Sequence, residues 1–172
     1  MPIHRLNHAV LYVRSVARSV TFYTDVLGFE VVMEMGGKAA FLRAPESTND
    51  HDLGLFEIGA QAGPSTAGRA TVGLYHLAWE VDTLHDLEVL AGKLAEAGAL
   101  VGSSDHSTTK SLYGQDPDGL EFEVAWIVPA DLLDDAALGG RDRIRPLDLG
   151  REMKRYGAET PGGIGISRVV AR

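Results

Sequence analysis

The chain has 172 residues, of which 45% are hydrophobic and 23% charged, and its formal net charge is −8. This length suits one ordinary domain or two small modules, and the hydrophobic content excludes an intrinsically disordered chain. An acidic chain without clustered Lys and Arg is poorly suited to nucleic acid or anionic membranes, and the absence of cysteine excludes disulfides and thiolate metal sites. The N-terminus lacks a secretion signal and no apolar run is long enough to span a membrane, which predicts a soluble, cytoplasmic protein with a small-molecule partner.

The first half of the chain predicts a strand, a helix and three further strands. Alternating residues indicate the strands, and a helical period followed by Gly28 indicates the helix. Gly36 and Gly37 provide a hairpin turn. The predicted elements are strand 6–13, helix 16–26, and strands 29–35, 39–43 and 51–58.

The same order of elements returns after a Gly-, Ala- and Ser-rich linker at 61–71. Gly98 ends the second helix, and an Asp-Pro-Asp-Gly turn at 116–119 precedes the last strand. The predicted elements are strand 74–81, helix 84–97, short strands near 100–101 and 110–113, and strand 120–128.

This repetition predicts an α+β fold made of two βαβββ modules, 1–60 and 72–128. A C-terminal extension follows at 129–172, with a helix expected around 147–156. We expect the extension to wrap the modules or to mediate association.

Two histidines occupy equivalent positions in the two halves. His8 lies 20 residues before Gly28, and His76 lies 22 residues before Gly98. Side chains alternate across a strand, so the neighbours of each histidine indicate which face it shares. His8, His76 and Glu123 each lie opposite an apolar stripe suited to packing under a helix. The stripes are Ala9, Leu11 and Val13; Leu77, Trp79 and Val81; and Phe122, Val124 and Trp126.

Two neutral imidazoles and one carboxylate would bind a divalent ion and fill about half of an octahedral shell, leaving positions for substrate. His8, His76 and Glu123 are therefore candidate metal ligands, held by a curved mixed sheet around the metal site. The alternative is that the two histidines are ordinary half-buried side chains and that Glu123 is a solvated residue.

These ligand positions, together with the repeat, resemble the vicinal oxygen chelate superfamily. It includes glyoxalase I, fosfomycin- and bleomycin-resistance proteins and type I extradiol ring-cleavage dioxygenases. The resemblance covers roughly residues 4 to 128, and the family's ligand positions correspond here to His8, His76 and Glu123. The usual dioxygenases carry two such double modules per chain, whereas this chain has one pair and an extension. A partner chain or the extension is therefore expected to close the pocket, which implies a homo-oligomer.

Within that superfamily the closest likeness is to the extradiol dioxygenase signature. His106, the Leu112-Tyr113 pair, the turn at 116–119 and Glu123 follow its spacing. The likeness implies that His106 and Tyr113 hydrogen-bond the substrate or an oxygen intermediate. The His51-Asp52-Leu53 stretch is similar to the strand that supplies the family's acid–base histidine. The implied reaction is cleavage of a catechol-like aromatic ring with O2, with Fe(II) favoured and Mn(II), Ni(II), Co(II) or Zn(II) as alternatives.

Two other functions remain open at this stage. In a glyoxalase-like isomerase or lyase, a fourth ligand from the strand before the second module completes the metal shell, and Glu57 sits on that strand. By alternation Glu57 shares a face with His51, so one of the two would approach the metal while the other stays outside it. A metal-free ligand-sequestering protein of the bleomycin-resistance type would need none of the ligands. The dioxygenase is preferred because His51, His106 and Tyr113 all fit it and a glyoxalase needs none of them.

Overall fold

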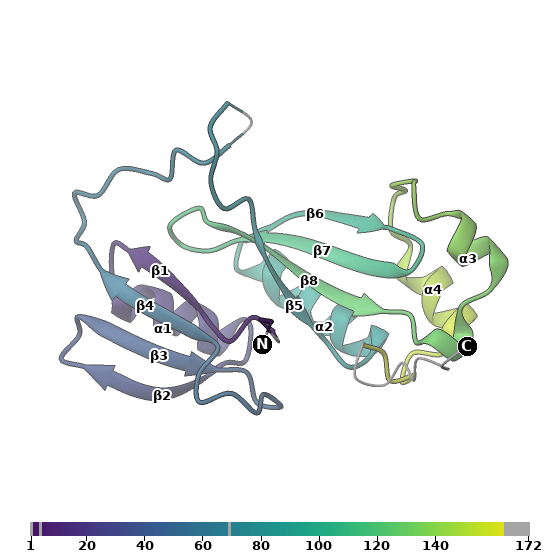
Figure 1. Cartoon of the computed structure of the whole chain (residues 1–172), viewed down its shortest axis with the longest axis horizontal. Helices are drawn as coiled ribbons and strands as arrows, with labels where there is room; N and C mark the ends of the chain where they lie inside the picture. Colours follow the sequence, from purple (N-terminus) through teal and green to yellow (C-terminus); the bar gives the residue numbers. More distant parts are fainter. Residues whose placement is uncertain (1, 4, 69, 164–172) are drawn as a thin grey trace. The chain divides into compact units, whose positions relative to one another are not determined.

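A computed structural model describes residues 2–3, 5–68 and 70–163. The chain forms two compact units, each described by itself (Figure 1). Unit 1 contains Met1–Thr66 together with Asp116–Gly119, and unit 2 contains Ala67–Gln115 and Leu120–Arg172. Unit 1 thus includes a four-residue turn whose flanking strands belong to unit 2.

Unit 1 is a four-stranded mixed sheet with one helix on one face (Figure 1). The strand order is β1-β4-β3-β2, with β1 and β4 parallel and the other pairs antiparallel. The elements are β1 (Ala9–Val13), α1 (Val16–Asp25), β2 (Glu30–Met35), β3 (Ala39–Arg43) and β4 (Leu53–Glu57).

Helix α1 begins where Ser15 accepts a hydrogen bond from the Arg18 amide, and the chain turns away at Gly28, whose φ is 78°. Both features follow from short-range chemistry, because a hydroxyl caps free helical amides and glycine tolerates positive φ. The helix buries Val16 and Tyr23. The facing side of the sheet contributes the apolar core of the unit, which includes Leu11, Val13, Ala40, Leu42, Leu53 and Leu55.

Unit 2 repeats this order and adds the C-terminal extension. Its sheet has the order β5-β8-β7-β6, again with one parallel pair, β5 with β8. The first elements are β5 (Leu77–Glu80), α2 (Leu84–Glu96), β6 (Leu100–Asp105), β7 (Thr109–Gln115) and β8 (Glu121–Ile127). The extension holds η1 (Ala130–Leu132), α3 (Asp135–Gly139) and α4 (Leu149–Tyr156).

Helix α2 starts with a capping box, in which Thr83 and Asp86 each accept a hydrogen bond from the other's amide. The helix buries Leu84, Leu87 and Leu94. The sheet supplies the other half of this core, including Leu112, Phe122, Val124 and Trp126.

The predicted α+β fold with two βαβββ modules is confirmed, since both units have the same element order and strand order. Several strand boundaries differ from the prediction; β1 begins at Ala9 rather than at residue 6, and β4 begins at Leu53 rather than at residue 51. β5 begins at Leu77 rather than at residue 74, and β6 continues to Asp105 well beyond the short strand expected near 100–101. The sequence did not predict the full length of β6 because the later residues of this strand are mostly polar. The strand is held by pairing with β7 rather than by an apolar stripe.

The extension packs on unit 2. The α4 helix expected around 147–156 is present, and its Tyr156 ring lies 5.5 Å from the ring of Trp126. Farther along, the Gly162 and Gly163 amides donate to the carbonyls of Asp82 and Ile127. Among the described residues, no helix is both long and apolar enough to cross a membrane.

Candidate metal site and polar sheet face

The face of the unit 2 sheet away from α2 gathers polar side chains from three strands. In the strand register, Glu123 on β8 pairs with Ala78 on β5 and with Tyr113 on β7. Paired residues point to the same side of a sheet, so Glu123 and Tyr113 share this face. His76 lies one residue before β5 begins.

His76 and Glu123 meet directly. The Nε2 atom of His76 lies 3.1 Å from Oε2 of Glu123, and both side chains are largely buried. The hydroxyl of Ser111 donates to the other carboxylate oxygen of Glu123 at 2.5 Å. Ser111 on β7 fixes the carboxylate, and its position could have been found from the sequence because it alternates with Tyr113 on the same strand.

This pair fits a divalent ion. Two ligand atoms about 2.1 Å from one ion and at right angles to each other are separated by about 3.0 Å, close to the His76–Glu123 distance. Nitrogen and oxygen donors suit several divalent ions. Within the described residues, the Nδ1 atom of His76 is buried and has no hydrogen-bond partner. The imidazole is thus not fully satisfied as an ordinary core histidine would be.

A second polar pair lies on the same sheet face. The Nε2 atom of His106 lies 2.7 Å from the hydroxyl oxygen of Tyr113, and the Tyr113 ring is 6.0 Å from that of His76. Burial first, and then the negative charge of Glu123, raise the pKa of Tyr113 above its ordinary value. The Tyr113 hydroxyl therefore keeps its proton at neutral pH and can donate a hydrogen bond.

In unit 1, His8 and His51 lie side by side with their ring centroids 4.5 Å apart. The ring of Phe41 packs edge-on against His51 at 5.0 Å. Asp50 places a carboxylate oxygen 3.0 Å from Nδ1 of His51. The two histidines predicted for metal binding and for acid–base chemistry in the first module are therefore neighbours.

Glu57 lies away from this pair. Its carboxylate accepts hydrogen bonds from the Val16 amide at the start of α1 and from Lys38. The expectation that Glu57 and His51 share a strand face is therefore wrong. β4 begins at Leu53, so the alternation that orients Glu57 does not extend back to His51.

Each unit thus gathers part of the predicted set: His8 with His51 in unit 1, and His76 with Glu123, His106 and Tyr113 in unit 2. Neither unit by itself, in the parts that the structure describes, groups three or more His, Asp or Glu side chains that could hold a metal ion. The three-ligand set of His8, His76 and Glu123 spans both units and stays a prediction.

The chain belongs to the Glyoxalase/Bleomycin resistance protein/Dioxygenase superfamily, whose family model matches residues 5–124. This match covers both modules and ends one residue after Glu123. The superfamily contains dioxygenases and lyases alike, so membership alone does not determine the reaction.

Curated relatives include two enzymes named as dioxygenases. The chain is 32% identical over 122 residues to catechol-2,3-dioxygenase from Bacillus subtilis, covering 69% of this chain and 40% of the relative. It is 36% identical over 126 residues to biphenyl-2,3-diol 1,2-dioxygenase 3 from Rhodococcus globerulus, covering 70% and 62%. This chain therefore spans less than two thirds of the length of either enzyme.

Among solved structures, a glyoxylase/bleomycin resistance protein/dioxygenase domain from Frankia sp. superposes with a TM-score of 0.58 at 25% identity. The superposition covers 72% of this chain and 92% of that domain. The likeness supports the duplicated fold.

Proposed function

We propose that this protein is a metal-dependent extradiol-type dioxygenase that cleaves a catechol-like aromatic ring with O2. The observation that carries the proposal is the meeting of His76 and Glu123 on the sheet face that also holds the His106–Tyr113 pair. The likeness of the chain to enzymes named as catechol and biphenyl-diol dioxygenases supports the same reaction.

His8, His76 and Glu123 would hold the metal. Fe(II) is the ion we favour for oxygen chemistry, with Mn(II), Ni(II), Co(II) and Zn(II) as the alternatives that the same donors accept. A divalent ion supplies positive charge that favours the deprotonated catechol oxygens, together with open positions beside them. The carboxylate of Glu123, steadied by Ser111, offsets part of that charge.

The remaining side chains handle protons. Ring cleavage inserts both atoms of O2 into the product and breaks one carbon–carbon bond, while the catechol must first lose a proton and regain one later. His51 is the candidate base, because an imidazole nitrogen can accept a proton and return it, and the Asp50 carboxylate is positioned to orient the ring. Tyr113 would donate a hydrogen bond from its hydroxyl, supported by His106.

The isomerase alternative loses support from the position of Glu57. Its two carboxylate oxygens are occupied by the Val16 amide and by Lys38, on the α1 side of the sheet. A fourth ligand from β4 would have to leave both partners. The sequestering alternative does not account for the contact between His76 and Glu123.

Activity with catechols would test the proposal. Protein loaded anaerobically with Fe(II) is mixed with a panel of catechols and then with O2, while oxygen uptake and the yellow ring-opened product are followed. We expect turnover that falls at least about a hundredfold in His51→Phe, since general acid–base groups contribute about 10²–10⁴ in rate. The matched control is His85→Phe, at an exposed position on α2.

No oxygen uptake with any catechol, accompanied by turnover of hemithioacetals, would replace this proposal with the isomerase. We also propose that the chain associates with further copies, because the unit 1 sheet leaves Val10, Tyr12 and Met33 exposed. Light scattering during size-exclusion chromatography would measure the mass, and a strict monomer with full activity would refute the association.

A further inference from the structure

The hairpin turn that carries His106 has an unusual backbone. Ser107 has a φ of 72°, in the region that favours glycine. The Thr108 amide donates to the His106 carbonyl at 2.9 Å, which closes a three-residue turn around Ser107. A γ-turn with positive φ at its centre is the rare and strained form. Such a backbone persists where its surroundings hold it in place.

Each polar group of Ser107, namely its amide, its carbonyl and its hydroxyl, has a hydrogen-bond partner. Its amide donates to Oδ1 of Asp105 at 2.8 Å, and its carbonyl accepts from Nζ of Lys110 at 3.1 Å. Its hydroxyl donates to the carbonyl of Ala137, on α3 of the extension, at 2.8 Å. The extension also packs closely here, since a Cβ on Gly140 would lie 2.6 Å from the Ser107 hydroxyl oxygen.

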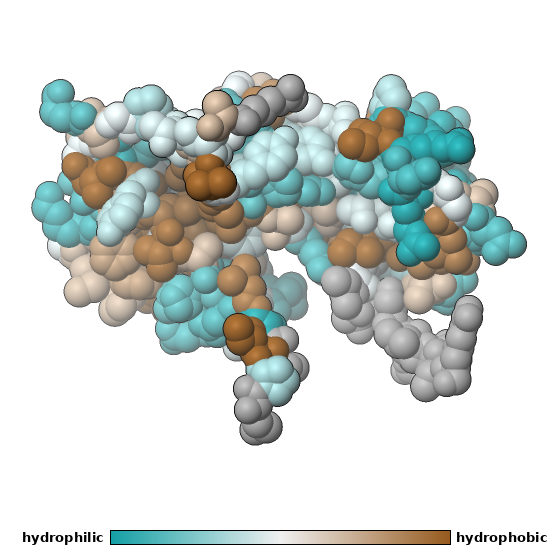
Figure 2. Space-filling model, turned by 45° about the horizontal axis from the view of Figure 1, so that its top comes forward, coloured by the Kyte–Doolittle hydropathy of each residue, from teal (hydrophilic) through white to brown (hydrophobic). Residues whose placement is uncertain are grey.

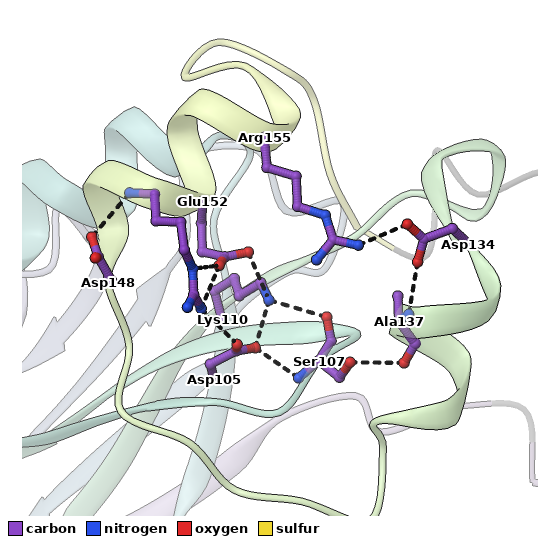
Figure 3. Close-up of polar contacts among 9 residues, drawn as sticks. Asp105, Ser107, Lys110, Asp134, Ala137, Asp148, Glu152 and Arg155 are labelled. Atoms are coloured by element: carbon purple, nitrogen blue, oxygen red, sulfur yellow. Dashed lines mark hydrogen bonds and ion pairs between the residues drawn. The ribbon is translucent and has the colours of Figure 1, made fainter.

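A buried ion cluster joins the same turn to α4 (Figure 3). Lys110, on β7, is 1% exposed and donates hydrogen bonds to Asp105 at 2.5 Å and to the Ser107 carbonyl. It also forms an ion pair with Glu152, with the two charged atoms 3.0 Å apart. Arg151 on α4 binds Glu152 at 2.8 Å and Asp105 at 3.4 Å, so two cations balance two carboxylates.

The two faces of β7 carry side chains with different surroundings. Lys110 and Leu112 point toward the helices and are buried, while Ser111 and Tyr113 point to the polar sheet face. The extension therefore contacts one face of the β6–β7 hairpin, and the side chains of the proposed site lie on the other face. His106 lies at the end of this hairpin and reaches Tyr113.

We propose that the C-terminal extension positions His106 against Tyr113 by holding the 106–108 turn, with Ser107, Lys110 and Glu152 as positioning residues. The catalytic consequence rests on the proposed dioxygenase function, whereas the positioning itself does not. A buried ion cluster is weak evidence for stability, because apolar side chains of similar size fill such a space equally well. Its directional contacts to a strained turn instead point to control of geometry.

Ser107→Ala tests the first anchor, because it removes the hydroxyl that binds α3 and keeps the rest of the turn. We expect amide hydrogen exchange at His106 and Thr108 to quicken at least about tenfold and the nuclear Overhauser contact between the His106 and Tyr113 rings to weaken. In the Fe(II)-loaded protein, kcat should fall about tenfold or more with KM and metal content unchanged. Ser103→Ala, at an exposed position on the same hairpin, should match the wild type in all five measurements.

The Lys110→Met/Glu152→Met double variant tests the second anchor without leaving a lone buried charge on either residue. We expect it to fold and to show the same loss of exchange protection and ring contact. Unchanged amide exchange and ring contact in both folded variants would overturn the positioning of His106 by the extension. Faster exchange with an unchanged kcat would overturn its catalytic consequence. If the wild type cleaves no catechol, the proposed function fails, and the exchange and ring contact still decide whether the extension positions His106.

Discussion

The two units share one strand order but present opposite chemistry on the sheet faces that their long helices leave open. In unit 1 this face carries apolar side chains that the unit leaves exposed, namely Val10, Tyr12, Met33, Met35 and Phe56. Hydrophobic residues are prominent on this half of the space-filling view (Figure 2). In unit 2 the corresponding face carries Ser111, Tyr113 and Glu123.

The difference shows that a duplicated fold can keep one arrangement of strands while its outer faces diverge. Burial under the helix keeps most of the inner face of each sheet apolar. The outer faces are free of that requirement, so the face in unit 1 is apolar and the face in unit 2 is polar. The histidine that precedes the first strand of each module, His8 or His76, is the feature the two outer faces keep in common.

Removing a proposed metal ligand is expected to have the largest effect and to test whether residues of both units are needed. His76→Ala and Glu123→Ala should lower bound metal from about one ion per chain to a tenth of that or less, with activity reduced about a thousandfold or more, since the ion supplies several kcal/mol to the transition state. His8→Ala should do the same from unit 1. Elemental analysis after dialysis measures the metal.

Glu57→Gln provides the matched control, because this carboxylate binds Val16 and Lys38 instead. Full metal content in His8→Ala would confine the metal to unit 2 and reject the three-ligand set. Loss of metal in Glu57→Gln would restore the isomerase reading.

Replacing Tyr113 by Phe is expected to have the next largest effect. The change removes the hydroxyl that pairs with His106 and keeps the ring beside His76. Loss of one positioned hydrogen-bond donor costs about 10²-fold in kcat, so a fall of about a hundredfold is expected with metal content unchanged. Steady-state kinetics on the best catechol measures it. Tyr75→Phe is the comparison, and an equal fall in both variants would remove any special role from the His106–Tyr113 pair.

The sequence predicted most of the fold because local signals and the global repeat agree. Alternation, the helical period and the glycines after each helix, Gly28 and Gly98, marked both modules. It also predicted which side of β8 carries Glu123, since a seven-residue strand keeps its period throughout. Alternation was misleading at His51, which lies just outside β4.

Contacts between distant segments were beyond the reach of sequence patterns. Lys110 begins the short strand predicted near 110–113, but its burial against Glu152, 42 positions later, depends on how the extension packs. Likewise, the acidic turn at 116–119 predicted a hairpin and gave no sign that Asp118 would bind Arg14 and Arg18 in unit 1.

That turn provides a stability test for unit 1. The Asp118 carboxylate is 6% exposed and accepts hydrogen bonds from the Arg14 amide and side chain and from Arg18. Asp118→Asn should lower the free energy of unfolding by about 2 kcal/mol, since hydrogen bonds to charged groups contribute about 1.5–3 kcal/mol. Urea unfolding followed by circular dichroism measures the loss, and amide exchange at Arg14 should quicken most. Asp25→Asn, near the exposed end of α1, is the control; an equal loss there would mean that the ion pairs contribute nothing specific.

The matching test in unit 2 is acid unfolding. Burial alone would raise the pKa of Asp105, but the hydrogen bonds from Lys110 and the Ser107 amide, with the charges of Lys110 and Arg151, outweigh it and hold that pKa below its ordinary value. A lowered folded-state pKa adds stability that is complete above the unfolded value of about 3.9 and is lost as pH falls through the folded value.

Unit 2 should therefore lose stability below about pH 4, and the loss should be shallower in Asp105→Asn, which has no carboxylate to protonate. Both tryptophans, Trp79 and Trp126, belong to unit 2, so urea titrations monitored by their fluorescence between pH 6 and 3 report on it directly. The effect is the smallest of the four because it reflects one carboxyl group. An identical pH slope in the wild type and in Asp105→Asn would show that the charge of this carboxylate does not hold the extension to the sheet.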